Sequence, residues 1–217
     1  MISEVLSGLT ANGIGRLKYM PYKMDVALSV VKRICQGIEP EFDSRPEIED
    51  VYKQLIMWFH GDAAFNGDLY RGIMLMGPTG TGKTLAMKVM NIYRQIDDIK
   101  FLLHSRIYRM NYDIIDVNCI VNAFLNNAFE GVDMYCSRYI LCIDDIGSEM
   151  DRVKHYGNTL DVISYIIAER YTKRLLTFGT TNFPIRVLEE KYDDRIISRM
   201  YALFNFIEMK SIDFRRH

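Results

Sequence analysis

The segment Gly77–Thr84 constrains the fold of this chain more than any other part of its sequence. It reads Gly-Pro-Thr-Gly-Thr-Gly-Lys-Thr and fits the pattern G-x-x-x-x-G-K-[ST]. An apolar run, Gly72–Met76, precedes it, and a stretch with helical character, Lys83–Gln95, follows it. Glycines let the backbone wrap closely around phosphates, and the start of a helix adds its positive dipole end. The sequence therefore predicts a phosphate-binding loop between a buried strand and a helix.

The same loop predicts its ligand. We expect ATP to bind here, with Lys83 reaching the β- and γ-phosphates and Thr84 binding Mg²⁺. The alternative is a glycine-rich turn with a chance lysine, which the eight fitting positions and the flanking elements disfavour. The expected nucleotide-binding residues are Gly77, Pro78, Thr79, Gly80, Thr81, Gly82, Lys83, Thr84 and Leu85.

A second apolar run ends in two acids. Tyr139–Ile143 predicts a buried strand, and Asp144 and Asp145 follow it directly. We expect Asp144 to hold Mg²⁺, directly or through water, and Asp145 to orient and activate the attacking water. Alone, the pair could mark only the end of a strand. It lies about 60 residues after the phosphate loop, which leaves room for one more strand and helix between the two motifs.

A third apolar run, Leu175–Thr181, is followed by Asn182. A polar side chain there would lie between the phosphate loop and the acidic strand, where Asn182 could position the water or sense the γ-phosphate. The alternative is that Asn182 forms a simple turn before Phe183 and Pro184.

Two arginines share one face of a predicted helix. Arg195 and Arg199 are four residues apart in the run that follows Asp193 and Asp194. Arg199 is the candidate for an arginine finger, which would act on the nucleotide of a neighbouring subunit. The alternative is a solvated helix whose arginines pair with the two acids.

Hydrophobic periodicity predicts the remaining elements. Strands alternate with helices along the chain, which implies a parallel sheet covered on both faces. The further elements are a helix from Ser44 to Phe59 that opens with the capping box Ser44-Arg45-Pro46-Glu47, a loop at Gly61–Gly67, an extended run at Arg106–Met110, a helix at Asp116–Phe129, a helix at Asn158–Lys173 capped by Asn158, and a strand at Phe204–Met209.

Composition excludes several classes of protein. The chain has 217 residues, of which 12% are aromatic, and this is too apolar for global disorder. The 27 basic and 28 acidic residues give a net charge of −1, which excludes a bulk nucleic-acid coat. We expect no membrane span and no signal peptide, because no apolar run is long enough and Met1–Leu17 lacks a basic opening.

The four cysteines are Cys35, Cys119, Cys136 and Cys142, and none of them forms a CxxC pair. Their spacing predicts neither a disulfide framework nor a zinc site. We therefore expect reduced thiols in or near the core of a cytoplasmic protein.

The four segments GPTGTGKT, YILCIDDIGSE, LLTFGTTN and DDRIISRM, in this order, resemble those of AAA+ ATPases of the DnaC/IstB/DnaI type. These are bacterial and phage helicase loaders and transposition helper ATPases. The resemblance covers roughly Pro46 to Arg215. It implies a three-layer αβα P-loop NTPase core with a five-stranded parallel sheet in the strand order 5-1-4-3-2.

The resemblance also implies roles for single residues. Lys83 and Thr84 correspond to the Walker A motif, and Asp144 and Asp145 to Walker B. Asn182 corresponds to sensor 1, and Arg199 to the arginine finger. Many AAA+ proteins carry Glu where Asp145 stands, so we expect an ATPase that is slow and is stimulated by assembly or DNA.

We expect two regions. Residues 1–45 form an N-terminal arm that could bind a partner, and residues 46–217 form the AAA+ core. The second region has room for the core without a full C-terminal lid domain.

The expected function is that of a helicase-loader-like switch in DNA replication, which binds DNA and a replicative helicase and forms nucleotide-dependent homo-oligomers. One alternative is a transposition helper that answers to a transposase. Another is an adaptor that binds ATP without hydrolysing it. A nucleotide kinase would need a second substrate pocket and a lid, for which the sequence gives no sign.

Two short clusters mix basic and aromatic residues, as surfaces that bind single strands do. The first holds Arg106, Tyr108 and Arg109, and its alternative is a half-exposed strand edge. The second holds Lys18, Tyr19, Tyr22 and Lys23; it could dock DNA or a protein, or simply pack on the core.

Overall fold

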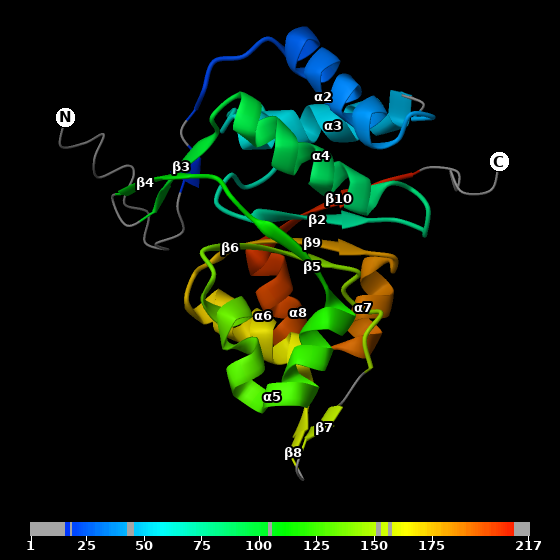
Figure 1. The fold of residues 1–217 in the computed structure, drawn as a ribbon, viewed down its shortest axis with the longest axis vertical. Coiled ribbons are helices and arrows are strands. Elements are labelled where there is room, and N and C mark those ends of the chain that lie inside the picture. The colour runs from blue at the N-terminus through cyan, green and yellow to red at the C-terminus, as the bar shows by residue number, and fades with distance from the viewer. Residues whose placement is uncertain are drawn as a thin grey trace. The chain divides into compact units, whose positions relative to one another are not determined.

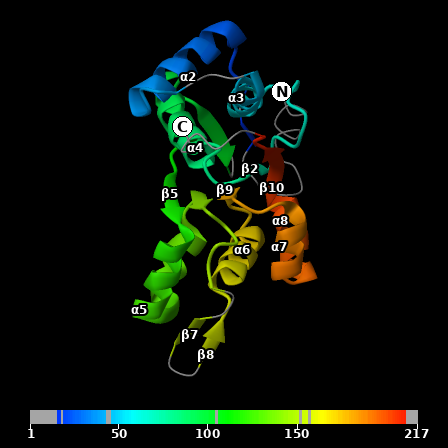
Figure 2. The ribbon, with the colours of Figure 1, turned by 90° about the vertical axis from the view of Figure 1, so that its right-hand side faces the viewer.

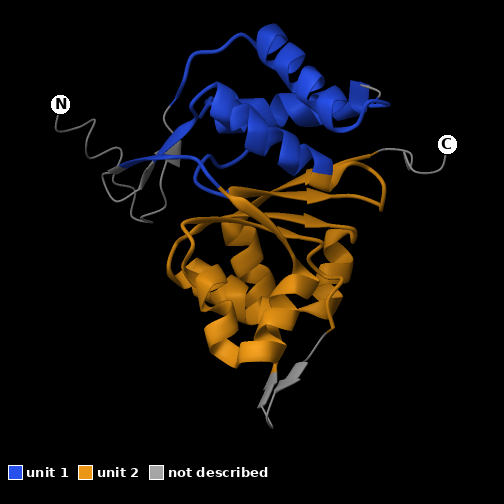
Figure 3. Ribbon diagram, viewed as in Figure 1, with its two compact units in different colours: residues 1–71, 85–111 blue, residues 72–84, 112–217 orange. Residues whose placement is uncertain are grey.

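The structure is a computed structural model that describes residues 16–17, 19–42, 46–103, 106–150, 153–155 and 158–210. The chain divides into two compact units, which Figure 3 distinguishes by colour. Unit 1 takes residues 1–71 and 85–111, and unit 2 takes residues 72–84 and 112–217. The predicted phosphate loop and both acidic residues belong to unit 2.

Unit 2 contains a parallel sheet of five strands (Figure 1). Its order across the sheet is β10-β2-β9-β6-β5, which becomes 5-1-4-3-2 when the strands are counted along the chain. The α/β class and the expected strand order are therefore confirmed. The strands are β2 (Gly72–Met76), β5 (Asp113–Asp116), β6 (Ile140–Asp144), β9 (Leu176–Thr181) and β10 (Phe204–Glu208).

Four helices of unit 2 gather on one face of this sheet (Figures 1 and 2). Their apolar sides meet the sheet in one core, in which Ile143, Ile166 and Met200 have no exposed surface. The helical layer expected on the other face stays a prediction. The four helices are α5 (Val117–Ser137), α6 (Val162–Thr172), α7 (Ile185–Lys191) and α8 (Asp194–Leu203).

The predicted helix Asn158–Lys173 was wrong at its start. Residues Asn158–Leu160 form strand β8, which pairs with β7 (Val153–His155) in an antiparallel hairpin. The helix begins only at Val162, because the side chain of Asp161 caps it by accepting a hydrogen bond of 2.9 Å from the Ser164 N–H.

The predicted helix Asp116–Phe129 has a different end. Asp116 is its cap, and α5 continues to Ser137 across a break at Asn127 and Ala128, where Ala128 has a φ of +50°. The parallel strand expected between the two motifs is β5. The extended run at Arg106–Met110 is not that strand, although it is extended as predicted.

Unit 1 holds that extended run as β4 (Arg106–Arg109). It pairs with β3 (Lys100–Leu103) in an antiparallel sheet that β1 (Arg16–Leu17) completes. The helices of unit 1 are α2 (Met24–Ile38), α3 (Pro46–Phe59) and α4 (Lys83–Ile96), of which α4 enters unit 1 at Leu85. Ser44 and Arg45 of the predicted capping box lie outside the described residues.

Helix α2 lies within the expected N-terminal arm and was not predicted. It packs against α3, where Lys32 forms an ion pair of 2.9 Å with Glu49 and Cys35 donates to the Tyr52 hydroxyl at 3.2 Å. The boundary expected at residue 46 thus falls inside unit 1. As a division of function it stays a prediction.

Part of the N-terminal basic and aromatic cluster packs on unit 1. The Tyr22 ring stacks on the buried His60 ring with centroids 4.3 Å apart, and its hydroxyl donates to Asp62 at 2.7 Å. Tyr19 is exposed, and Lys18 lies outside the described residues. For Tyr22, the packing alternative is the one that the structure contains.

Three of the four cysteines, Cys35, Cys136 and Cys142, are buried, and Cys119 is exposed. All four are free thiols. Within the described ranges, no helix is both long and apolar enough to cross a membrane.

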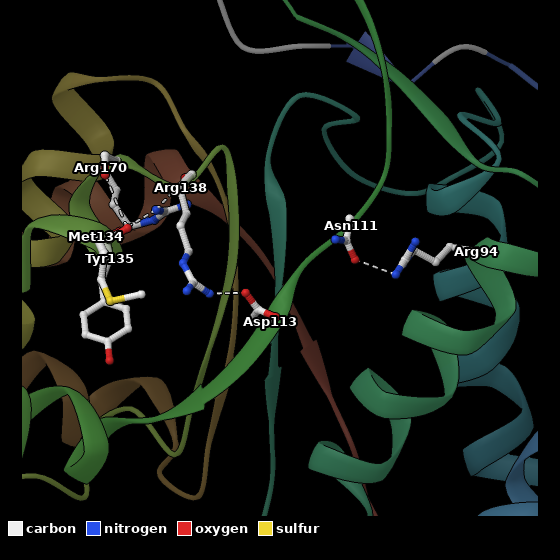
Figure 4. A network of polar contacts seen from close by, with 8 residues as sticks. Arg94, Asn111, Asp113, Met134, Tyr135, Arg138 and Arg170 are labelled. Atoms are coloured by element: carbon white, nitrogen blue, oxygen red, sulfur yellow. Dashed lines mark hydrogen bonds and ion pairs between the residues drawn. The ribbon is translucent and has the colours of Figure 1, made fainter.

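A fully buried arginine of α6, Arg170, links this helix to α5 and β9. Figure 4 shows Arg170 beside Tyr135 and Arg138 at the end of α5. Arg170 donates to the carbonyl oxygens of Tyr135, Arg138 and Leu176 at 2.7–2.9 Å and to the Thr177 hydroxyl at 2.9 Å. Burial lowers the pKa of Arg170 to about 9, which still leaves it protonated at pH 7. Nearby, Arg138 also pairs with Asp113 of β5.

We predict that Arg170→Met lowers the free energy of unfolding by about 3–5 kcal/mol, because four buried acceptors lose their donor. Urea denaturation measures this loss. The control is Arg186→Met, at a side chain that is 86% exposed and that, among the residues the structure describes, pairs only with Glu190 one turn away. It should change stability by less than about 0.5 kcal/mol. Equal effects of the two variants would contradict the linking role of Arg170.

Candidate nucleotide-binding site

The phosphate loop has the backbone that its glycines predict. Gly80 and Gly82 have φ values of +85° and +88°, in the left-handed region that side chains rarely adopt. At Gly77, a Cβ atom would come within 2.4 Å of the Met209 carbonyl oxygen, so no other residue fits there. Pro78 and Thr79 form the exposed part of the loop, and Thr81 is buried.

Lys83 begins α4 directly after the loop, and its side chain is 4% exposed. Its ammonium group donates to the carbonyl oxygens of Gly77 at 2.7 Å and Pro78 at 2.8 Å. The positive charge of Lys83 is therefore held against the loop, which is where a lysine that binds phosphates has to lie. Leu85 is half-buried and belongs to unit 1, so its place at the site stays a prediction.

Thr84 and Asp144 meet across 60 residues of sequence. The Thr84 hydroxyl lies 2.9 and 3.0 Å from the two carboxylate oxygens of Asp144, which ends β6. No group of three or more His, Cys, Asp and Glu side chains that could hold a metal occurs among the described residues. A hydroxyl and one carboxylate suit Mg²⁺, which usually completes its shell with phosphate oxygens and water. The two residues thus fit the expected ion.

Asp145 and Asn182 lie in direct contact. The Asn182 amide donates to Asp145 Oδ1 at 2.9 Å. Asp145 has a φ of +62°, which turns its backbone sharply at the end of β6. Burial raises the pKa of the Asp145 carboxyl, and the negative charge of Asp144 adds to this effect, while Lys83 opposes it.

Thr180 is a site residue that the sequence reasoning missed. It lies on β9 with no exposed surface, and its hydroxyl donates to Asp144 Oδ1 at 2.6 Å. The Thr180 hydroxyl oxygen in turn accepts a hydrogen bond of 2.9 Å from the Asp145 N–H. Thr180 therefore contacts both acids at once. A hydroxyl two residues before Asn182, at the end of the neighbouring strand, was the available signal.

Arg199 lies apart from these contacts. Its guanidinium group is 5.7 Å from the centre of the Tyr171 ring, a contact between α8 and α6. Arg195 is exposed. Across the described part of the chain, neither arginine forms an ion pair with Asp193 or Asp194, and Asp193 instead caps α8 by accepting from the Ile196 N–H at 2.8 Å. The alternative of a salt-bridged helix is therefore not what the structure contains.

The residues of unit 1 that were candidates for DNA binding differ in their surroundings. The Tyr108 ring stacks on the buried Phe101 with centroids 5.6 Å apart. Arg109 is 80% exposed and forms an ion pair of 3.1 Å with Asp98. The side chain of Arg106 lies outside the described part. A role of this strand in binding DNA stays a prediction.

No protein-family profile matches the chain, and no curated protein matches its sequence. Solved structures do share its fold. A Streptococcus pyogenes serotype M3 protein described as a "putative primosome component" has a TM-score of 0.58 and 18% identity, over 81% of this chain and 86% of that one. DnaI has a TM-score of 0.53 and 20% identity, over 90% of this chain and 95% of that one.

A third structure is the replication initiator DnaA bound to AMPPCP and single-stranded DNA. It has a TM-score of 0.53 and 17% identity, and the match covers 80% of this chain and 49% of that one. Identities this low show the fold alone. The chain has the α/β fold of these proteins, and at the level of the fold the resemblance to AAA+ ATPases of the DnaC/IstB/DnaI type is supported.

We predict that Thr180→Val lowers the free energy of unfolding by about 1–3 kcal/mol, because the Asp144 carboxylate and the Asp145 N–H both lose a buried partner. Thr180→Ser keeps the hydroxyl and should lose less. Thr172→Val is the control, since it removes an exposed hydroxyl that donates a hydrogen bond of 2.9 Å to the Ala168 carbonyl one turn back in the same helix. Urea denaturation of the three variants compares them, and a Thr180→Val protein as stable as the control would contradict the bridging role.

Proposed function

We propose that this chain is an AAA+-type switch that binds ATP with Mg²⁺, hydrolyses it, and acts in DNA replication in the manner of a helicase loader. The observation that carries the proposal is the meeting of Lys83, Thr84, Asp144, Asp145 and Asn182 at the carboxyl ends of β2, β6 and β9. In open α/β sheets, ligands bind at this edge.

Each residue has a distinct part in the proposed reaction. Lys83 and the loop amides bind the phosphates, and Thr84 and Asp144 hold Mg²⁺. The ion stabilises negative charge on the phosphate oxygens. Asn182 donates to Oδ1 of Asp145, so we assign Oδ2 to the attacking water. The aspartate is shorter than the glutamate common at this position, and we therefore expect slow turnover.

The replication role has support from the three structural neighbours, since one is described as a primosome component, one is DnaI and one is the initiator DnaA. They favour a replicative helicase over a transposase as the partner. Binding of AMPPCP and of single-stranded DNA belongs to DnaA, and we extend both to this chain as part of the proposal.

We predict that Lys83→Ala lowers the ATPase rate by at least about 100-fold and weakens ATP binding, because the phosphates lose their buried cation. Lys88→Ala is the control, at an exposed lysine on the same helix. Phosphate release and binding of a fluorescent ATP analogue measure the two effects. Unchanged turnover in Lys83→Ala would overturn the site assignment.

Asp145→Asn separates the switch from the adaptor that never hydrolyses ATP. The switch requires that this variant bind ATP but lose turnover and partner-dependent activity. Full activity of Asp145→Asn, together with no phosphate release by the wild-type chain in the presence of DNA and partner, would establish the adaptor instead.

We predict that Arg199→Ala leaves ATP binding by the single chain intact and removes the hydrolysis that depends on assembly. Mixing it with Lys83→Ala tests action between subunits. The first variant keeps the ATP site and the second keeps Arg199, so the mixture should regain part of the lost rate. No recovery, or loss of ATP binding by Arg199→Ala alone, would exclude the finger.

A further inference from the structure

Glu149 is a buried carboxylate to which the proposed reaction gives no role. Its side chain is only 5% exposed. Oε2 accepts a hydrogen bond of 2.8 Å from the Gly147 N–H, and Oε1 accepts one from the Tyr192 hydroxyl. The ammonium group of Lys191 lies 3.7 Å from Oε1 and donates to the backbone carbonyl of Glu149 at 2.8 Å.

These contacts hold the turn that follows the two acids. The turn contains two residues in the left-handed region, Asp145 with a φ of +62° and Gly147 with a φ of +97°. Its first half is tied to β9, because the Ile146 N–H donates to the Thr180 carbonyl at 2.8 Å. Its second half is tied through Gly147 to Glu149.

Two features of this turn are unfavourable in isolation: the buried carboxylate of Glu149 and the positive φ of Asp145. A buried carboxylate requires hydrogen bonds and a counter-charge, which Gly147, Tyr192 and Lys191 supply. An aspartate with positive φ persists only where the surrounding structure imposes that backbone. Glu149 connects the turn to the end of α7. Its carboxylate accepts hydrogen bonds from the Gly147 N–H in the turn and from the hydroxyl of Tyr192, which is the C-cap of α7.

We propose that Glu149 is a positioning residue for Asp145. By binding Gly147 and Tyr192 together, it fixes the turn in the conformation that keeps the Asp145 carboxylate against Asn182. This inference rests on the proposed function, in which Asp145 orients the attacking water. It predicts that loosening the turn slows turnover without weakening the binding of ATP, because the phosphate loop is left unchanged.

The test variant is Tyr192→Phe, which removes one hydroxyl and keeps the ring in the core. We expect kcat to fall by about 10- to 100-fold, as misplacement near a reacting centre can cause, while the dissociation constant for ATP stays within about twofold. Tyr201→Phe is the matched control, because Tyr201 donates to Glu189 at 2.9 Å in an exposed pair of the same chemistry. It should leave kcat unchanged.

Glu149→Gln is the second variant, with Glu189→Gln as its control. It keeps an acceptor near Gly147 and removes the charge, so we expect a smaller fall in kcat than in Tyr192→Phe. A double-mutant cycle locates the effect: in an Asp145→Asn background, Tyr192→Phe should lower the residual rate by less than about twofold.

Amide hydrogen exchange tests the turn without any hydrolysis. In Tyr192→Phe, the Gly147 amide should exchange about tenfold faster or more, whereas the Ile146 amide, bound to β9, should change less. Thermal unfolding confirms that each variant is folded. An unchanged Gly147 exchange rate, an unchanged kcat, or a parallel loss of ATP affinity would each overturn the positioning role.

The two proposals fail in different ways. A wild-type chain that neither binds nor hydrolyses ATP overturns the proposed function, while the exchange of Gly147 still decides whether Glu149 holds the turn. If Lys83→Ala abolishes turnover and Tyr192→Phe does not slow it, the function stands and the positioning role of Glu149 is wrong.

Discussion

The parallel register of β6 and β9 is the constraint on which the candidate site depends. Ile143 pairs with Gly179, so the residues that follow them, Asp144 at the end of β6 and Thr180 one residue before the end of β9, lie side by side. Thr180 then reaches both acids through one hydroxyl oxygen. Because side chains alternate across a sheet, a slip of one residue would turn Thr180 to the opposite face. The apolar residues that bury β6 and β9 thus also set the polar geometry at the strand ends.

The features that could be predicted from the sequence are those that short segments encode by themselves. The phosphate loop, the acids after β6 and Asn182 after β9 each follow from local residue order. Thr180 could not be assigned in this way, since its role comes from a register between strands that lie 36 residues apart in sequence. The start of α6 was predicted wrongly for a local reason. Asn158 and Asp161 are both residue types that cap helices well, and it is Asp161 that accepts the hydrogen bond from the Ser164 N–H. Arg199 was placed on a helix correctly, and a role between subunits depends on a second chain that the residue order of one chain does not encode.

The site combines regular secondary structure with backbone conformations that are unfavourable for most residues. The strands and the start of α4 provide a regular frame, and positive φ values occur in the connections, at Gly77, Gly80, Gly82, Asp145 and Gly147. Four of these five are glycines, for which positive φ has no steric cost. Asp145 is the exception, and it is the residue to which we assign the water. Strain of this kind clusters at functional sites because the surrounding contacts must hold the chemistry in place.

The buried Arg170 has a consequence for how this sequence can change over generations. Three of its four acceptors are main-chain carbonyls, at Tyr135, Arg138 and Leu176, which every amino acid possesses. Substitutions at those three positions leave the acceptors in place, so homologues can vary there while position 170 stays arginine. Glu149 and Tyr192 are bound side chain to side chain, and a change in one leaves the other without its partner. In an alignment, position 170 should therefore be invariant beside variable neighbours, whereas positions 149 and 192 should change together.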